Sequence, residues 1–234
     1  MVAAIREDLT VQPRPSVIVF DVNETLSDMA PLAGRFAEVG VPELLAKVWF
    51  ASLLGDGFAL TATGGKETFA RLATGVLRAV LAGASLNRPA DDAVDHVLAG
   101  FSELVVHPDV PEGVRLLCQH GLRLVTLTNG SPEVADRLLC KAGIRGEFEQ
   151  LLSAGNAGAW KPARAAYAHA ASACSVGIED MLLVAVHPWD IHGAHQAGMH
   201  TGWITRQETP YPGYFAAPDV RAPDLVALAG QIVA

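Results

Sequence analysis

Three short runs dominated by hydrophobic residues are the feature of this sequence that most restricts its fold. The runs cover residues 17–20, 122–127 and 182–186, and a polar residue directly follows each of them. Runs of this kind are typical of strands that are covered on both faces of a parallel sheet. A weaker run covers residues 201–204. The pattern therefore predicts a buried parallel sheet.

Helical patterns alternate with these strands along the chain. Ser131 and Pro132 form a typical helix start, and Gly143 is a typical stop for that helix. Comparable helical patterns cover residues 111–120, 162–174 and 189–197, the last of them ended by Gly198. This alternation predicts an α/β fold with a doubly wound, Rossmann-like parallel sheet.

Residues 31–104 interrupt the alternation, because helical patterns follow one another there without a strand between them. The patterns cover residues 31–39, 42–54, 66–81 and 90–104, and glycine-containing stretches at 55–57 and 64–65 are expected to end helices. We expect residues 29–104 to form a helical cap subdomain, inserted into a core made of residues 1–28 and 105–234. Residues 107–111 are the expected return linker.

The composition argues against two classes of partner. The chain has 234 residues, half of them hydrophobic, and a formal net charge of -8 at pH 7, whereas surfaces that bind nucleic acid or anionic membranes are normally basic. No apolar stretch is expected to approach the ~18 residues of a membrane helix.

The three cysteines lie far apart, which fits neither a disulfide framework nor a paired zinc site. The opening residues turn acidic, unlike a secretory signal, so we expect a cytoplasmic protein.

The polar residues that follow the strands are the candidates for chemistry. Asp21 follows the first run, Thr128 and Asn129 the second, and His187 and Asp190 the third. The carboxyl ends of parallel strands meet at one edge of the sheet, and ligands bind there. A carboxylate at this edge can act as a nucleophile and form an ester that water later cleaves. An aspartate there can also serve only as a cap.

Two further features indicate a site for anions. Ser131 begins a helix directly after the second strand, and the free N–H groups and dipole of a helix N-terminus favour negative charge. Lys161 lies between Trp160 and Pro162, at a helix start. Such a lysine is either a surface residue or, when buried beside Asp21, a group that keeps the carboxylate ionised.

Taken in order, these segments resemble the motifs of the haloacid dehalogenase (HAD) superfamily, and specifically its L-2-haloacid dehalogenase (type II) branch. Residues 20–26, Phe-Asp-Val-Asn-Glu-Thr-Leu, are similar to the first motif, and residues 127–132 are similar to the second. Lys161 with Tyr167 resembles the third motif. Asp190 with residues 202–206 resembles the fourth. The resemblance covers residues 17–206.

The resemblance implies a hydrolytic dehalogenase for short 2-haloalkanoic acids that needs no metal or other cofactor. Asp21 would attack the carbon that bears the halogen, expel halide and form an ester, which water then hydrolyses. Lys161 would keep Asp21 ionised, and Asp190 would orient Lys161 and the water. The expected catalytic residues are Asp21, Thr25, Lys161 and Asp190, and the expected substrate-binding residues are Asn23, Phe50, Thr128, Asn129, Tyr167 and His187. The resemblance also suggests a homodimer.

A Mg²⁺-dependent phosphatase is the main alternative, because most of the superfamily transfers phosphoryl groups. Phosphatases of this type carry a second aspartate two residues after the nucleophile, as a general acid. Asn23 occupies that position here and cannot donate and recover a proton in the same way. A further aspartate that holds Mg²⁺ is replaced by Val186, although a hard cation prefers oxygen ligands.

Two departures from the family pattern concern the halide. The family places a halide-binding arginine in the cap, but this chain has no arginine between Arg35 and Arg71. The family also has a Ser-Ser-Asn segment, which is replaced in this chain by Ala-Val-His ending at His187. His187 could supply the missing positive or donor group, and Phe50 could line a substrate pocket or pack within the cap. The missing arginine leaves open a third interpretation, a binding protein that kept the fold and lost catalysis.

Overall fold

The computed structural model describes residues 15–206 and 209–234, so the expectations for the first fourteen residues lie outside the described part. A six-stranded sheet has the order β5-β4-β1-β6-β7-β8, and its neighbouring strands are parallel. The strands are β1 (Val17–Phe20), β4 (Arg123–Thr128), β5 (Gln150–Ser153), β6 (Met181–Ala185), β7 (His200–Ile204) and β8 (Val220–Ala222). Because the chain extends the sheet to both sides of β1, the predicted doubly wound class is confirmed.

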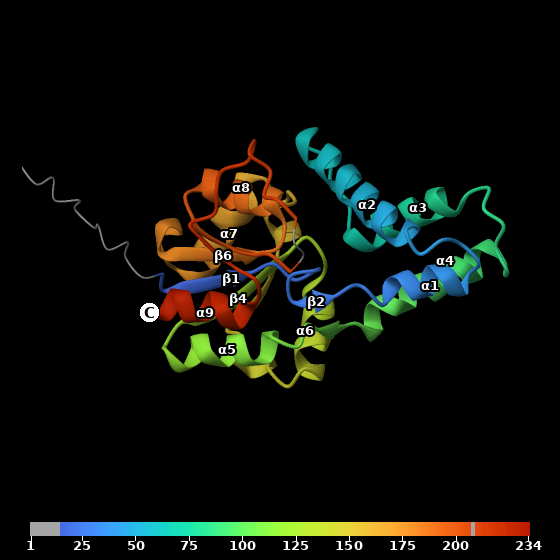
Figure 1. The fold of residues 1–234 in the computed structure, drawn as a ribbon. Helices are drawn as coiled ribbons and strands as arrows, with labels where there is room; N and C mark the ends of the chain where they lie inside the picture. The colour runs from blue at the N-terminus through green and yellow to red at the C-terminus, as the bar shows by residue number, and fades with distance from the viewer. Residues whose placement is uncertain (1–14, 207–208) are drawn as a thin grey trace, which may run out of the picture.

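Helices cover both faces of this sheet (Figure 1). On one face lie α5 (Val110–Gln119) and α9 (Leu225–Val233), and on the other lie α7 (Arg164–Cys174) and α8 (Pro188–Ala197). Successive residues of a strand point to opposite faces, so Val17 and Val19 pack with α7 and α8, while Ile18 and Phe20 pack with α5 and α9. None of these four side chains is exposed, which explains why the run shows no polar alternation.

Helix ends that the sequence predicts are confirmed at three places. The helix α6 (Pro132–Lys141) begins after Ser131, whose hydroxyl accepts a hydrogen bond from the Val134 N–H. Pro111 lies in the first turn of α5. Gly198 follows α8 with a left-handed backbone, φ +102°, which glycine adopts without strain.

Two edge strands and one helix on a face of the sheet were not predicted. The edge strands β5 and β8 are short, and β8 holds only three residues with Arg221 exposed between its neighbours. Such a strand contains no hydrophobic run that a pattern could identify. The helix α9 is apolar over almost its whole length, so it lacks a polar face and the helical periodicity that comes with one.

Four helices lie between two short antiparallel strands, β2 (Ser27–Asp28) and β3 (Val105–Val106), which carry the chain away from the sheet and back. The helices are α1 (Leu32–Glu38), α2 (Leu45–Ala62), α3 (Phe69–Leu81) and α4 (Ala90–Glu103). They share a hydrophobic cluster that includes Phe36 and Trp49, and Figure 1 shows them beside the sheet and not on its faces. The order of elements agrees with a helical insertion, and the division at residues 29–104 stays a prediction.

One expectation about these helices is wrong, because the stretch 55–57 does not end a helix. The helix α2 continues through it to Ala62, shortly before Gly64. Gly57 is buried against the side chain of Trp160, and a Cβ atom at residue 57 would lie 2.3 Å from that ring. This close approach requires a glycine. Tertiary packing therefore outweighs the low helix propensity of glycine, a cost of about 1 kcal/mol.

The same helix also overturns the expectation that no apolar stretch approaches the length of a membrane span. Among the described residues, α2 has 18 residues with a mean hydropathy of 1.2, so by length and composition alone it could span a membrane. Of these residues, 22% are buried inside the protein. Its Trp49, Phe50 and Leu53 side chains are buried within the protein. Helices that pack inside globular proteins pass the same test, so this finding by itself assigns no membrane contact.

Candidate active site

The carboxyl ends of β4, β1 and β6 bring the expected polar residues together. Phe20, the last residue of β1, pairs with Thr126 of β4 and with Val184 of β6. The next residue, Asp21, donates a backbone hydrogen bond to the Val184 carbonyl at 3.0 Å. Asp21 thus leaves the sheet where the strand order reverses, which is where open α/β sheets bind ligands.

Buried charged and polar groups lie on one side of Asp21. Lys161 Nζ donates hydrogen bonds to Asp21 Oδ1 at 2.8 Å and to Asp190 Oδ2 at 2.6 Å. The Tyr167 hydroxyl donates to Asp190 Oδ1 at 2.6 Å. Lys161, Tyr167 and Asp190, here called the inner side, have no exposed surface. Lys161 is therefore a buried partner of Asp21 and not a surface lysine.

Charge compensation keeps Asp21 and Lys161 ionised. Burial alone would raise the pKa of Asp21, but Lys161 and His187 outweigh burial and hold that pKa well below its usual value. Burial would lower the pKa of Lys161, but Asp190 and Asp21 outweigh burial and raise it. Burial and the charge of Asp21 raise the pKa of Asp190, against the opposing effect of Lys161. Asp21 is therefore a carboxylate at neutral pH, beside a protonated lysine.

Asn129 and Thr128 make their side-chain hydrogen bonds to backbone groups. Asn129 Oδ1 accepts from the backbone N–H of Lys161 at 2.8 Å, and Asn129 Nδ2 donates to the Lys161 carbonyl at 3.2 Å. The Thr128 hydroxyl accepts from the Gly130 N–H at 3.0 Å. Both residues were expected to position Asp21 and the substrate carboxylate, and among the described residues neither side chain is hydrogen-bonded to Asp21. Asn129 instead fixes the backbone that carries Lys161.

The second carboxyl oxygen of Asp21 faces a different set of groups. Oδ2 accepts from the Thr25 hydroxyl at 2.7 Å, and that hydroxyl in turn accepts from the Val186 N–H at 3.1 Å. His187 Nδ1 lies 3.1 Å from the same Oδ2, and His187 Nε2 lies 2.8 Å from Glu24 Oε2. Thr25, His187 and Glu24 are here called the outer side.

His187 is held in its protonated form. Burial would lower its pKa, but hydrogen bonds and charge from Asp21 and Glu24 outweigh burial and raise the pKa to about 9. A protonated imidazole donates from both nitrogens, so both N–H groups of His187 point at carboxylates. The hypothesis that His187 supplies positive charge is thereby supported. Neither of its N–H groups is free to donate to a halide in this arrangement.

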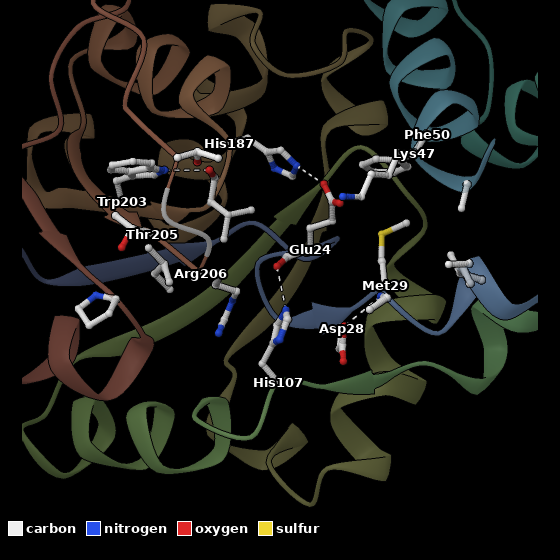
Figure 2. A pocket seen from close by; sticks show the side chains of 18 residues that line it. Glu24, Asp28, Met29, Lys47, Phe50, His107, His187, Trp203, Thr205 and Arg206 are labelled. Atoms are coloured by element: carbon white, nitrogen blue, oxygen red, sulfur yellow. Dashed lines mark hydrogen bonds and ion pairs between the residues drawn. The ribbon is translucent and has the colours of Figure 1, made fainter. Parts of the chain in front are cut away.

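A cavity of about 570 Å³ opens on the outer side, as Figure 2 shows. Glu24, Lys47, Phe50 and His187 are among the residues that line it, and the ring of Phe50 lies 6.4 Å from the ring of His187. In Figure 2 the His187–Glu24 hydrogen bond lies at the cavity, and Lys47 and Phe50 reach in from α2. Phe50 therefore lies where a substrate-lining residue was expected. His187 connects the cavity with Asp21.

Aromatic side chains of the inserted helices pack against core residues next to the site. The ring of Phe58 lies 5.0 Å from the ring of Trp189, and Phe69 stacks on Trp160 at 5.9 Å. Phe69 and Trp160 also line a second cavity of about 690 Å³, together with Asn129. The site thus has hydrophobic walls with a few polar groups, which suits a small and partly apolar ligand.

Three residues differ from the expectations for the substrate pocket. Tyr167 was expected to line it, but the side chain is fully buried, lies at neither cavity and holds Asp190. Asn23 lies with its amide beside Gly130, at the start of α6. Glu24 was not predicted at all. The sequence did contain a feature that could have identified Glu24, because it is a charged residue between Asp21 and Thr25, within the motif that holds both of these expected catalytic residues.

The two carboxylates do not fit a Mg²⁺ site. A hard divalent cation needs several free oxygen ligands, whereas both oxygens of Asp21 and both oxygens of Asp190 already accept hydrogen bonds, two of these bonds from the Lys161 ammonium group. Val186 offers no side-chain oxygen. Across residues 15–206 and 209–234, no group of three or more His, Cys, Asp or Glu side chains is arranged to hold a metal ion.

A doubly wound sheet with helices inserted after its first strand, and an ionised aspartate at the tip of that strand, define a hydrolase of the haloacid dehalogenase type. The family model described as haloacid dehalogenase-like hydrolase matches residues 15–198. The chain therefore belongs to this family, and the resemblance of the motifs is confirmed.

Individual relatives are mainly dehalogenases. The chain is 36% identical to the haloacetate dehalogenase H-2 of Moraxella sp. (strain B) over 128 residues, which cover 55% of this chain and 57% of that protein. It is 28% identical to the (S)-2-haloacid dehalogenase 4A of Burkholderia cepacia over 202 residues, 86% of this chain and 87% of that protein. A stretch of 131 residues, 54% of this chain, is 34% identical to a phosphoserine phosphatase of Thermus thermophilus and covers 52% of it.

Solved structures agree with these matches. A crystal structure of an L-2-haloacid dehalogenase superposes with a TM-score of 0.87 and 28% sequence identity, over 94% of this chain and 99% of that one. The fold therefore matches over nearly the whole length of both chains, although the match to the Moraxella enzyme spans little more than half of that protein.

Proposed function

We propose that this protein is a hydrolytic dehalogenase of short 2-haloalkanoic acids that uses Asp21 as its nucleophile and no metal ion. The observation that carries the proposal is the buried hydrogen bond between Lys161 Nζ and Asp21 Oδ1. A buried carboxylate is costly unless it is paired, and the lysine keeps it ionised and therefore nucleophilic. The relatives that match over most of their length are named as 2-haloacid dehalogenases, which supports this substrate class.

In the first step, Asp21 attacks the carbon atom that bears the halogen. Oδ2 accepts hydrogen bonds from Thr25 and His187, whereas Oδ1 accepts one from Lys161. Each carboxylate oxygen has room for about two donors, so Oδ1 keeps a free lone pair for the attack. A carbon–oxygen bond forms as the carbon–halogen bond breaks, and the halide leaves with the bonding electrons. Asp21 is then an uncharged ester.

In the second step, water cleaves this ester at Cγ of Asp21. The water oxygen bonds to Cγ, and the bond between Cγ and the substrate oxygen breaks. Lys161 and Thr25 donate to the two carboxyl oxygens of Asp21, so they are placed to stabilise the negative charge that develops in the transition state. The products are a 2-hydroxy acid, a halide ion and one proton.

The substrate and both product ions are negative, while the chain carries a net charge of -8. Positive charge must therefore be local. Lys47 of α2 lines the outer cavity together with Phe50 and the protonated His187. We propose that Lys47 and His187 attract the substrate carboxylate and the departing halide in place of the absent cap arginine.

A Mg²⁺-dependent phosphatase is the second candidate, because a phosphoserine phosphatase is among the relatives. Two residues oppose it. Asn23 cannot serve as the general acid for a leaving group, and Val186 cannot ligate a cation. A catalytically inactive binding protein is the third candidate, and the buried pair of Asp21 and Lys161 opposes it, because a silent site has no physical reason to keep this desolvated pair.

Product assays separate the three candidates. Halide release from 2-chloropropionate and from fluoroacetate is measured beside phosphate release from p-nitrophenyl phosphate, each with and without Mg²⁺. We expect halide release that does not depend on Mg²⁺. Metal-dependent phosphate release without halide would overturn the proposal, and no turnover of any of these substrates would favour the binding protein.

The nucleophile is tested by replacing one carboxyl oxygen with nitrogen. Asp21→Asn should lower halide release by about 10⁴-fold or more, because the covalent route is lost. Mass spectrometry of the quenched wild-type reaction should find the substrate-derived ester on the peptide that contains Asp21. We also propose a cytoplasmic homodimer, which light scattering and cell fractionation would test.

A further inference from the structure

His187 contacts the nucleophile with one ring nitrogen and faces the outer cavity. We propose that His187, positioned by Glu24, is the general base of the second step and accepts a proton from the water that cleaves the Asp21 ester. This inference rests on the proposed function, because it requires an ester on Asp21. It gives His187 a role that differs from the attraction of anions.

The geometry places His187 beside the carbon atom that water must attack. Nδ1 lies 3.1 Å from Oδ2, an atom bonded to Cγ of Asp21, so a water bound to Nδ1 on the side of Asp21 can also contact Cγ. The ring is held in place, because Trp189 stacks on it at 5.0 Å with an interplanar angle of 30° and Glu24 holds Nε2 at 2.8 Å.

Asp190 is the other candidate base near Asp21, but its oxygens are engaged. Oδ2 accepts from Lys161 and Oδ1 accepts from Tyr167. Its side chain has no exposed surface and, like Asp21 itself, it lines neither cavity, whereas His187 lines the outer cavity. Asp190 therefore fits the role of holding Lys161, and His187 is the base that combines a contact with Asp21 and access to the cavity.

Ester formation changes the charge around His187. In the resting protein the imidazole faces two carboxylates, Asp21 at Nδ1 and Glu24 at Nε2, with Lys161 beyond Asp21 and Lys47 at the same cavity. The two carboxylates outweigh burial and raise the pKa of His187 to about 9. An ester on Asp21 removes one of these charges. His187 can then lose its proton to the cavity at a pH at which the resting protein retains it.

The proton balance closes within the site. Neutral His187 takes one proton from the water as the water oxygen bonds to Cγ of Asp21. When the bond between Cγ and the substrate oxygen breaks, this oxygen takes the proton from His187 and leaves as the alcohol of the 2-hydroxy acid. The second water proton passes from the new carboxyl group of Asp21 to His187, which restores the protonated imidazole and the carboxylate of the resting protein. The one proton released in each turnover is therefore the proton that His187 lost to the cavity after the ester formed. No oxidant, reductant or further reactant is needed.

Glu24 has a backbone conformation that few residues adopt. Its backbone is left-handed, with φ +61°, which is uncommon for any residue other than glycine. Its carbonyl accepts from His107 Nε2 at 3.1 Å, and its N–H donates to the Ser27 hydroxyl at 3.3 Å. As Figure 2 shows, these contacts leave the carboxylate directed at His187. Glu24 is therefore a positioning residue that acts through His187.

Replacement of His187 separates the two steps of the reaction. His187→Gln and His187→Asn should release about one halide ion per protein molecule in a burst and then turn over about 10²–10⁴-fold more slowly than wild type. The ester should accumulate on Asp21 and be visible by mass spectrometry. The burst itself shows that the variant is folded and that its nucleophile is active. His195→Gln, at an exposed position of α8, is the matched control and should behave like wild type.

Two results would overturn the inference while leaving the proposed function intact. One is turnover of His187→Gln at the wild-type rate. The other is equal loss of burst and turnover in both folded His187 variants, with no ester on Asp21, while wild type forms the ester. Absence of the ester from wild type as well would overturn both the inference and the proposed function.

The pH dependence of turnover tests the role of Glu24. Glu24→Gln removes a negative charge from Nε2 of His187, so the halide burst should remain and the rise of turnover with pH should move to lower pH. Glu24→Asp keeps the charge and should restore part of the original profile. Identical pH profiles for wild type and Glu24→Gln would show that Glu24 does not act on His187.

Discussion

The two sides of Asp21 carry similar charges and differ in their access to solvent. On the inner side, Lys161 and Asp190 are completely buried, whereas on the outer side the side chains of His187 and Glu24 are 12% and 44% exposed. The buried Lys161 holds the pKa of Asp21 well below its usual value, so the inner side keeps the nucleophile ionised. The imidazole of His187 lines a cavity and can exchange its proton there. In the reaction that we propose, one carboxylate is thus kept ionised by its inner partners and regenerated by its outer ones.

Loss of the lysine should disrupt the inner side and have the largest effect on stability. Lys161→Met leaves Asp21 and Asp190 buried without their common cation, so halide release should fall by about 10²–10³-fold and the free energy of unfolding by about 3–5 kcal/mol. Steady-state kinetics and denaturant unfolding measure the two effects. Lys141→Met, at an exposed position, is the control, with an expected change within about 0.5 kcal/mol. A Lys161→Met variant with wild-type activity would refute the comparison.

Removal of a single hydroxyl tests how far the inner side depends on Asp190. Tyr167→Phe leaves Asp190 Oδ1 without its donor, and hydrogen bonds to charged groups contribute about 1.5–3 kcal/mol. We expect a loss of stability in this range and a clear reduction in halide release, because Asp190 then holds Lys161 less firmly. Tyr214→Phe alters a side chain that is 81% exposed and should change neither thermal unfolding nor turnover.

A matched pair of threonines sharpens the comparison on the outer side. Thr25→Val removes a hydroxyl that both donates to Asp21 and accepts from Val186, so it should cost about 1–3 kcal/mol. Thr126 is equally buried, but within the described residues its hydroxyl has no hydrogen-bond partner. Thr126→Val should therefore be neutral or stabilising. Equal unfolding free energies for the two variants would contradict the assignment of Thr25.

The smallest expected effect is a change in the pH dependence of stability. The pKa of His187 is raised to about 9 from 6.5, so its contribution to stability is complete below pH 6.5 and is lost as the pH rises through about 9. Glu24→Gln lowers this pKa and should flatten the decline of stability between pH 6.5 and 9, by about 1 kcal/mol. Urea unfolding at several pH values measures the slope. An unchanged slope in the variant would show that Glu24 does not contribute to the raised pKa of His187.

Much of the inner side could be predicted from the sequence, because strand order decides where its residues meet. Asp21 follows a strand, and Asp190 lies just beyond the end of another, so their proximity needs only a parallel sheet. Lys161 follows no strand directly, and its place came from the resemblance to a family motif. Its burial beside Asp21 then follows from the need to compensate a buried carboxylate.

The outer side and the insertion could be predicted less well, because their contacts depend on packing between distant segments. Glu24 meets His187 across 163 positions of the chain, and no local pattern records this pairing. The role of Asn129 depends on which backbone groups its amide reaches. The continuation of α2 through Gly57 depends on the ring of Trp160. In each case tertiary geometry decides, and sequence periodicity carries no information about it.

The contact between Trp160 and α2 also limits which substitutions the inserted helices tolerate. Trp160 contacts this helix in two ways: its ring occupies the space where residue 57 lacks a side chain, and its backbone N–H donates a hydrogen bond to the Thr61 hydroxyl at 3.1 Å. The residue that follows it in the chain is Lys161. A methyl group added at residue 57 would collide with this ring, so Gly57→Ala would force a shift of α2 or of the segment that carries Trp160 and Lys161. The space between α2 and the Trp160 ring therefore fits the hydrogen atom of a glycine but not a methyl group.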